Sequence, residues 1–158
     1  MNVTEFILTF EKARKKWDAL LKAFQIEDFE KIGVIAEMSL KNLVAHMSWY
    51  EMEMVELLST RALAGSDLWG LKDDERNQAI YEMNKGRGIE EVLEESAQVY
   101  SKLHKELSAL TDDQLSNPGA FEGMPDDWVP WKVIAGNSFN HYQQHFDDLE
   151  TWHSAIYN

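Results

Sequence analysis

The sequence of 158 residues contains no cysteine and no long apolar run. The absence of cysteine excludes disulfide bonds, thiolate metal sites and a cysteine nucleophile. It also fits a reducing compartment, so we expect a cytoplasmic protein. The N-terminal segment lacks a basic start followed by an unbroken apolar stretch, which argues against a signal peptide. No apolar stretch approaches the ~20 residues that a spanning helix needs, so we expect no membrane partner.

Basic residues are also scarce, with 15 Lys and Arg against 28 Asp and Glu and a formal net charge of −13. Nucleic acids and anionic membranes bind basic surfaces, so this balance predicts that the chain has no nucleic-acid partner. Hydrophobic residues still make up 44% of the chain, which is typical of a globular protein able to bury a substantial core. We therefore expect a single domain over residues 1–158.

An alternating β pattern of useful length is absent, whereas four long segments carry apolar residues at spacings of three and four. The first follows a candidate cap at Asn2, and the second follows a candidate cap at Ser39. The third starts near Gly88, and the fourth runs from about Pro130 to about Ile156. Four amphipathic helices of about 20 residues predict an all-α protein with a four-helix bundle.

The connections between these helices are unequal in length. Residues 61–87 form a long link between the second and third helices, and a short helix is expected within it over residues 73–83. So long a link allows the second and third helices to run parallel to each other, which a tight hairpin would not. Residues 111–129 are rich in turn-forming residues and predict a second sizeable loop.

Three histidines form a candidate metal site. His141 and His145 are four residues apart, so they project from one face of the fourth helix. His46 lies at the edge of the apolar stripe of the second helix, and a bundle can bring the second and fourth helices together. Three neutral imidazoles with an open position are typical of a catalytic metal site. The alternative, that all three are ordinary hydrogen-bonded or flanking polar residues, stays open on spacing alone.

Three further residues are candidates for supporting or proton-carrying roles. Asp148, three residues after His145, is placed to accept a hydrogen bond from the outer N–H of a ligating ring. Glu53, two turns after His46, is a candidate for the same role or for a general base. Tyr142, next to His141, is the third candidate proton carrier. Both carboxylates could equally be solvated surface groups.

Two of the helical segments resemble a known family. The stretches "SLKNLVAHMSWYE" and "NSFNHYQQHFDDLETW" are similar to the DinB-like superfamily and, more narrowly, to its ClbS/DfsB branch. The stretch "NQAIYEMNKGRGIEEVL" resembles the segment that leads into the third helix of such proteins. The resemblance implies an up-down-down-up four-helix bundle with a long crossover between the second and third helices. It also implies a divalent metal, zinc or nickel, because His46, His141 and His145 match the metal-binding positions of the family.

The resemblance leaves two functions open. The first is a metal-dependent enzyme, a transferase or a hydrolase, that acts on a small electrophilic molecule by thiol transfer or hydrolysis. A low-molecular-weight thiol is compatible with it as a further cofactor, and Glu53, Asp148 or Tyr142 would carry protons. The alternative is a protein of the ClbS type that binds, sequesters or gives self-protection against a small molecule without needing a metal. A homodimer is compatible with both.

Overall fold

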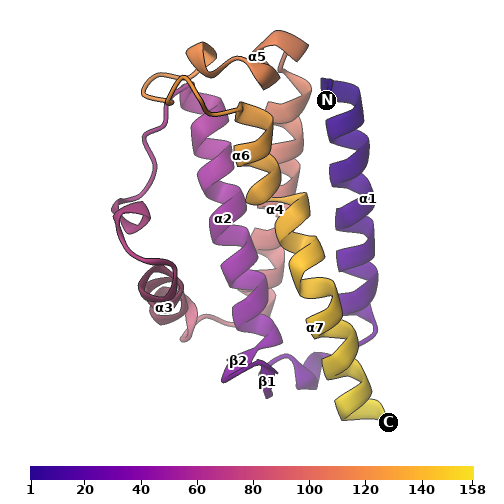
Figure 1. Ribbon diagram of the computed structural model, residues 1–158. Helices are drawn as coiled ribbons and strands as arrows, with labels where there is room; N and C mark the ends of the chain where they lie inside the picture. Colours follow the sequence, from indigo (N-terminus) through magenta and orange to yellow (C-terminus); the bar gives the residue numbers. More distant parts are fainter.

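The computed structural model describes residues 1–158 and is helical apart from one short antiparallel hairpin. Figure 1 shows four long columns of helix side by side, with α5 across one end and the hairpin at the other. The elements in chain order are α1 (Val3–Lys22), β1 (Ile32–Ile35), β2 (Met38–Ser39), α2 (Leu40–Thr60), α3 (Asp73–Asn84), α4 (Ile89–Ser108), α5 (Asp112–Ser116), α6 (Pro130–Gly136) and α7 (Phe139–Tyr157).

The topology is the predicted up-down-down-up bundle. In Figure 1, α1 runs down from the N-terminus, α2 and α4 both run up, and α6 with α7 runs down to the C-terminus. The parallel helices α2 and α4 pack extensively against each other, and α1 packs against α7. The long link between α2 and α4 crosses the outside of the bundle and contains α3, which confirms the predicted short helix.

Local capping explains where the first two long helices begin. The Asn2 side chain accepts a hydrogen bond from the Glu5 backbone N–H, and the Glu5 carboxylate accepts one from the Asn2 N–H. Ser39 caps α2 by accepting from the Asn42 N–H at 3.2 Å. Each cap satisfies backbone donors that the first turn of a helix leaves unpaired. The two predicted starts are therefore confirmed.

The core contains a buried polar network with one residue from each of the four long helices. The Tyr142 hydroxyl in α7 donates to the Glu51 carboxylate in α2 at 2.5 Å. Arg14 in α1 donates to the Tyr142 hydroxyl at 2.9 Å and to the Ser96 hydroxyl in α4 at 3.1 Å. Glu51 is fully buried, and this burial raises its pKa to about 7. The network therefore links all four long helices through buried hydrogen bonds.

The predicted fourth helix is broken into α6 and α7. The backbone at Ser138 leaves the helical region, with φ −137° and ψ −104°. The Asn137 amide donates to the Val133 carbonyl at 2.9 Å, and the Ser138 hydroxyl donates to the Ile134 carbonyl at 2.7 Å. These side-chain donors bond to the carbonyls of Val133 and Ile134, so both carbonyls stay paired where the helix breaks.

Two further observations complete the fold. The hairpin of β1 and β2 was not predicted, because six residues in two strands are too few to show a period of two. None of the helices combines the length and the apolar character that crossing a bilayer requires.

Candidate metal centre

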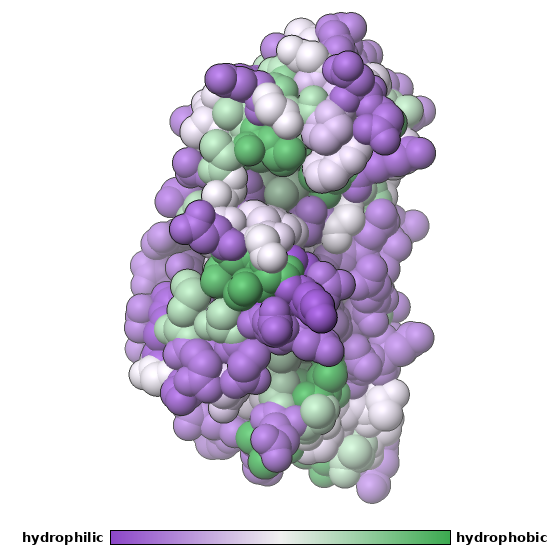
Figure 2. Space-filling view, turned by 60° about the vertical axis from the view of Figure 1, so that its left-hand side comes forward, coloured by the Kyte–Doolittle hydropathy of each residue, from purple (hydrophilic) through white to green (hydrophobic).

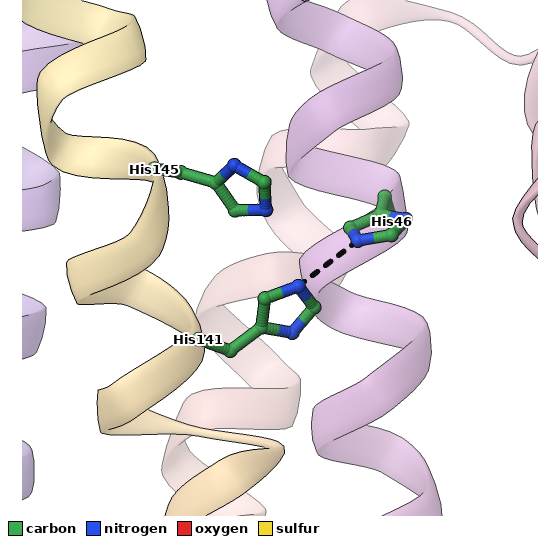
Figure 3. A group of neighbouring side chains, drawn as sticks. All are labelled: His46, His141 and His145. Atoms are coloured by element: carbon green, nitrogen blue, oxygen red, sulfur yellow. Dashed lines mark hydrogen bonds between the residues drawn. The ribbon is translucent and has the colours of Figure 1, made fainter. Parts of the chain in front are cut away.

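The three histidines singled out in the sequence come together between α2 and α7. His46 projects from α2, and His141 and His145 project from successive turns of α7, with all three rings pointing into the same space (Figure 3). The Nε2 atoms of His46 and His141 are 3.1 Å apart. One ligand atom from each of the three rings lies within 4.8 Å of the other two.

Burial keeps two of these imidazoles neutral. His46 is only 6% exposed, and His141 is half-buried. Burial lowers the pKa of His46 to about 4, with smaller contributions from His145 and Arg76. Burial also lowers the pKa of His141 to about 3, helped by the neighbouring His46 and His145. Both rings are therefore unprotonated at pH 7, and the neutral imidazole is the form that binds a metal ion.

The spacing of the donor atoms fits a divalent ion. Zinc–nitrogen bonds of about 2.0–2.1 Å in tetrahedral geometry put two ligand nitrogens roughly 3.3 Å apart. The separation of 3.1 Å between the Nε2 atoms of His46 and His141 is close to that value. Three imidazoles leave a fourth position for a water or a substrate. The residues present therefore fit a zinc or nickel ion, since both accept imidazole nitrogen.

Only one of the three rings has an outer hydrogen-bond partner. The Nδ1 atom of His145 lies 3.1 Å from a carboxylate oxygen of Asp148, as the sequence spacing predicted. The Nδ1 atoms of His46 and His141 have no hydrogen-bond partner. An outer carboxylate fixes the orientation and the tautomer of a ligating histidine. Asp148 is therefore placed to orient His145, whereas the only hydrogen bond of the His46 and His141 rings is the one between their Nε2 atoms.

The histidines line a cavity of about 340 Å³, to which α3 contributes Asp73 and Asn77. The Tyr50 hydroxyl donates to the Asn77 side-chain oxygen at 2.7 Å and accepts from the Arg76 Nε at 3.1 Å. Local sequence gave no signal for Asp73 and Asn77 as lining residues, because α3 reaches the cavity only through tertiary packing. The lining residues other than the three histidines are Ile35, Met38, Leu43, Tyr50, Asp73, Asn77, Gly136 and Gln144.

The other two candidate proton carriers lie away from this cavity. Tyr142 is fully buried, and its hydroxyl points into the core network with Glu51 and Arg14. Glu53 accepts hydrogen bonds from the Trp69 indole and the Ser66 N–H, and it lines a different cavity. Neither residue is among those lining the cavity beside the histidines. The structure thus brings four of the six candidate residues together: the three histidines and Asp148.

Comparison with known proteins identifies the family to which the chain belongs. A model described as the DinB superfamily matches residues 9–148, which is most of the chain. The chain belongs to the DinB superfamily. The resemblance of the histidine-containing segments to the DinB-like superfamily is therefore confirmed. No protein with a curated description matches the sequence.

Solved structures share the fold of this DinB superfamily chain at low sequence identity. An uncharacterised protein from Escherichia coli UTI89 is 20% identical, with a TM-score of 0.79 over 98% of this chain and 94% of its own. A Streptococcus pneumoniae protein is 13% identical, with a TM-score of 0.81 over 96% and 90%. The colibactin self-resistance protein ClbS is 15% identical, with a TM-score of 0.77 over 95% and 94%. Structural similarity at sequence identities this low establishes a shared fold and nothing about function.

The ClbS comparison corrects one prediction. ClbS was crystallised in complex with double-stranded DNA, so a chain of this fold can have a nucleic-acid partner. The exclusion of nucleic acid from the net charge of −13 was therefore wrong. A net charge is a sum over the whole surface, and it does not describe the potential of any one face.

Proposed function

We propose that this chain is a metal-dependent enzyme that acts on a small electrophilic molecule by thiol transfer or hydrolysis. The observation that carries the proposal is the convergence of three imidazoles, two of them kept neutral by burial, on one wall of a cavity. His46, His141 and His145 would hold a zinc or nickel ion. When bound, such an ion acts as a Lewis acid and lowers the pKa of a water or thiol, which provides a nucleophile near neutral pH.

The remaining residues of the cavity suggest how a substrate would be held. Ile35, Met38 and Leu43 offer an apolar side for its carbon framework. The Tyr50 hydroxyl is held between Asn77 and Arg76, so its orientation is set before a substrate arrives. Such preorganised polar groups bind a substrate without losing further freedom. In this proposal Asp148 positions His145, while Tyr142 stabilises the bundle and takes no part in proton transfer.

The proposed function is tested by metal dependence of a reaction. Protein stripped with a chelator would be offered zinc or nickel and screened against an epoxide and an aryl halide, each with and without a small thiol. We expect turnover only in the reloaded protein, and we expect it to be lost in the His145→Ala variant. Zinc affinity, measured by competition with a chromophoric chelator, provides a second readout. Equal turnover in stripped and reloaded protein would contradict the proposal.

The role of Asp148 gives a separate prediction. Replacing Asp148 with asparagine removes the negative charge that faces the Nδ1 atom of His145. Loss of such an outer partner typically weakens metal affinity by roughly 10- to 100-fold. We expect zinc affinity to fall by at least about tenfold, measured by the same competition assay. Asp147→Asn, at the exposed neighbouring position, is the matched control and should bind zinc as the parent does.

A further inference from the structure

A second and larger cavity lies beside the part of the long link that follows α2. It has a volume of about 570 Å³, against about 340 Å³ for the cavity at the histidines. Small-molecule sites typically measure ~300–1,000 Å³. It is lined by α2, by residues 62–66 and Trp69 of the link, and by Trp128 and Val133 at the start of α6. On this side of the molecule, Figure 2 shows apolar surface on both sides of a hollow in the upper half.

Large apolar side chains gather at the mouth of this cavity. Leu63, Trp69 and Trp128 line it and are 39%, 37% and 43% exposed. Met54 and Leu57 of α2, both buried, form its floor. Single exposed apolar residues are common, but a concave group of them marks a binding site.

One carboxylate is built into the wall of the cavity. An oxygen of Glu53 accepts from the Trp69 indole N–H at 2.6 Å and from the Ser66 N–H at 2.9 Å. A Cβ atom at Gly65 would come within 2.6 Å of the same oxygen and 2.7 Å of the Trp69 ring, so a larger residue here would have to displace both side chains. Glu53 makes no ion pair, and its second oxygen accepts no hydrogen bond from the protein. Its negative charge therefore lacks a cation from this chain.

We propose that this cavity binds a small organic ammonium ion with an aromatic or branched apolar body. The Glu53 carboxylate would receive a charge-assisted hydrogen bond from the ammonium group. Trp128 at the mouth would add cation–π attraction, for which tryptophan is the best side chain, while the Trp69 indole N–H holds the carboxylate in place. The Trp69 ring already attracts the Arg76 guanidinium, which lies 4.8 Å from its centroid. That guanidinium is itself paired with Asp73, so its charge is compensated.

The site is separate from the proposed metal centre and does not depend on it. Trp69 stands between the two cavities, with its ring 5.7 Å from that of Tyr50, which lines the cavity at the histidines. The two cavities share no lining residue. Loss of metal should therefore leave ammonium binding unchanged, and this separates a failure of this proposal from a failure of the enzymatic one.

The test compares three probes of similar shape by isothermal titration calorimetry. The probes are 2-phenylethylammonium, the neutral 2-phenylethanol and the anionic 3-phenylpropionate. We expect the parent to bind the ammonium roughly tenfold more tightly than the alcohol and to bind the anion most weakly. The Glu53→Gln variant should bind ammonium and alcohol equally. Glu56→Gln, at an exposed position one turn further along α2, should keep the preference.

Three further measurements locate the binding and guard against misfolding. Glutamine keeps a side-chain oxygen for Trp69 and Ser66, so Glu53→Gln should melt within a few degrees of the parent. Trp128→Ala should weaken the ammonium and the alcohol together. The ammonium should shift the indole N–H resonances of Trp69 and Trp128, also in the His141→Ala variant. Equal affinity for ammonium and alcohol in the parent, unshifted indole resonances, or binding lost in His141→Ala would overturn the proposal.

Discussion

Replacing Arg14 with methionine should lower the free energy of unfolding by about 3–5 kcal/mol, because it removes the cation of a buried network and leaves the Glu51 carboxylate buried without it. Arg14 is only 7% exposed, and it is the cation that faces Glu51 and Tyr142. Without it, the Glu51 carboxylate and the Tyr142 hydroxyl stay buried with fewer partners. Urea denaturation at pH 8 measures the effect. Lys15→Met, on the exposed side of the same helix, should change the value by no more than about 0.5 kcal/mol.

The loss in Arg14→Met should also depend on pH in a defined direction. Burial raises the pKa of Glu51 to about 7, above its ordinary value of 4.5. Between these two pH values Glu51 keeps a proton in the folded protein that it releases in the unfolded chain. The contribution of Glu51 to the free energy of unfolding therefore falls as pH rises from 4.5 through 7. Removing Arg14 raises the pKa of Glu51 further, so the variant should lose more stability at pH 8 than at pH 5.5. An equal loss at both pH values would contradict this assignment.

Acid should destabilise the metal-free protein through His46 and His141. Their pKa values in the folded protein are lowered to about 4 and about 3, whereas an unfolded histidine has a pKa near 6.5. Below pH 6.5 the unfolded chain binds protons that the folded protein does not, so stability falls as pH falls. The loss between pH 6.5 and the pH at which the folded ring titrates should be roughly 3 kcal/mol for His46 and roughly 5 kcal/mol for His141.

The contribution of one ring is isolated by a matched variant. His46→Gln removes one of the two titrating groups and leaves the carboxylates that also respond to acid. We expect the free energy of unfolding of this variant, measured in chelator by urea denaturation, to fall less steeply between pH 6.5 and pH 4.5 than that of the parent. Parallel curves for the two proteins would show that His46 does not change its protonation on unfolding in this range.

The parts of the fold that could be predicted from the sequence are those marked by residues close to one another along the chain. The caps at Asn2 and Ser39 are visible because a capping side chain acts within three residues of itself. The start of α4 at Ile89 follows from the apolar period and from acidic residues in its first turn. The length of the link allowed α2 and α4 to run parallel, because 28 residues are more than a tight hairpin needs, and the family resemblance implied that they do.

The break between α6 and α7 had no such signal. Asn137 and Ser138 are polar residues that occur inside many helices, and the pattern of apolar residues continues across them. Whether their side chains bond to Val133 and Ile134 or face solvent is decided by packing. Local sequence therefore predicted one helix where the structure has two.

The candidate site was predictable in part for the same reason. Four-residue spacing places His141 and His145 on one face, and the bundle supplies His46. The direction of Tyr142 was not predictable, because a tyrosine next to a face-lining histidine can turn to the cavity or to the core. Its neighbours Glu51 and Arg14 come from other helices and are adjacent to it only in the folded protein.

The central claim is tested most directly by metal content. Untagged protein purified without chelator, beside the His46→Ala and His141→Ala variants, would be analysed by inductively coupled plasma mass spectrometry. His104→Ala, a change at a histidine that bonds Glu11 on the surface of the bundle, is the control. We predict one divalent ion per chain in the parent and the control, and its loss in both site variants. A parent without metal after zinc and nickel are offered, or full metal in His141→Ala, would contradict the three-histidine site.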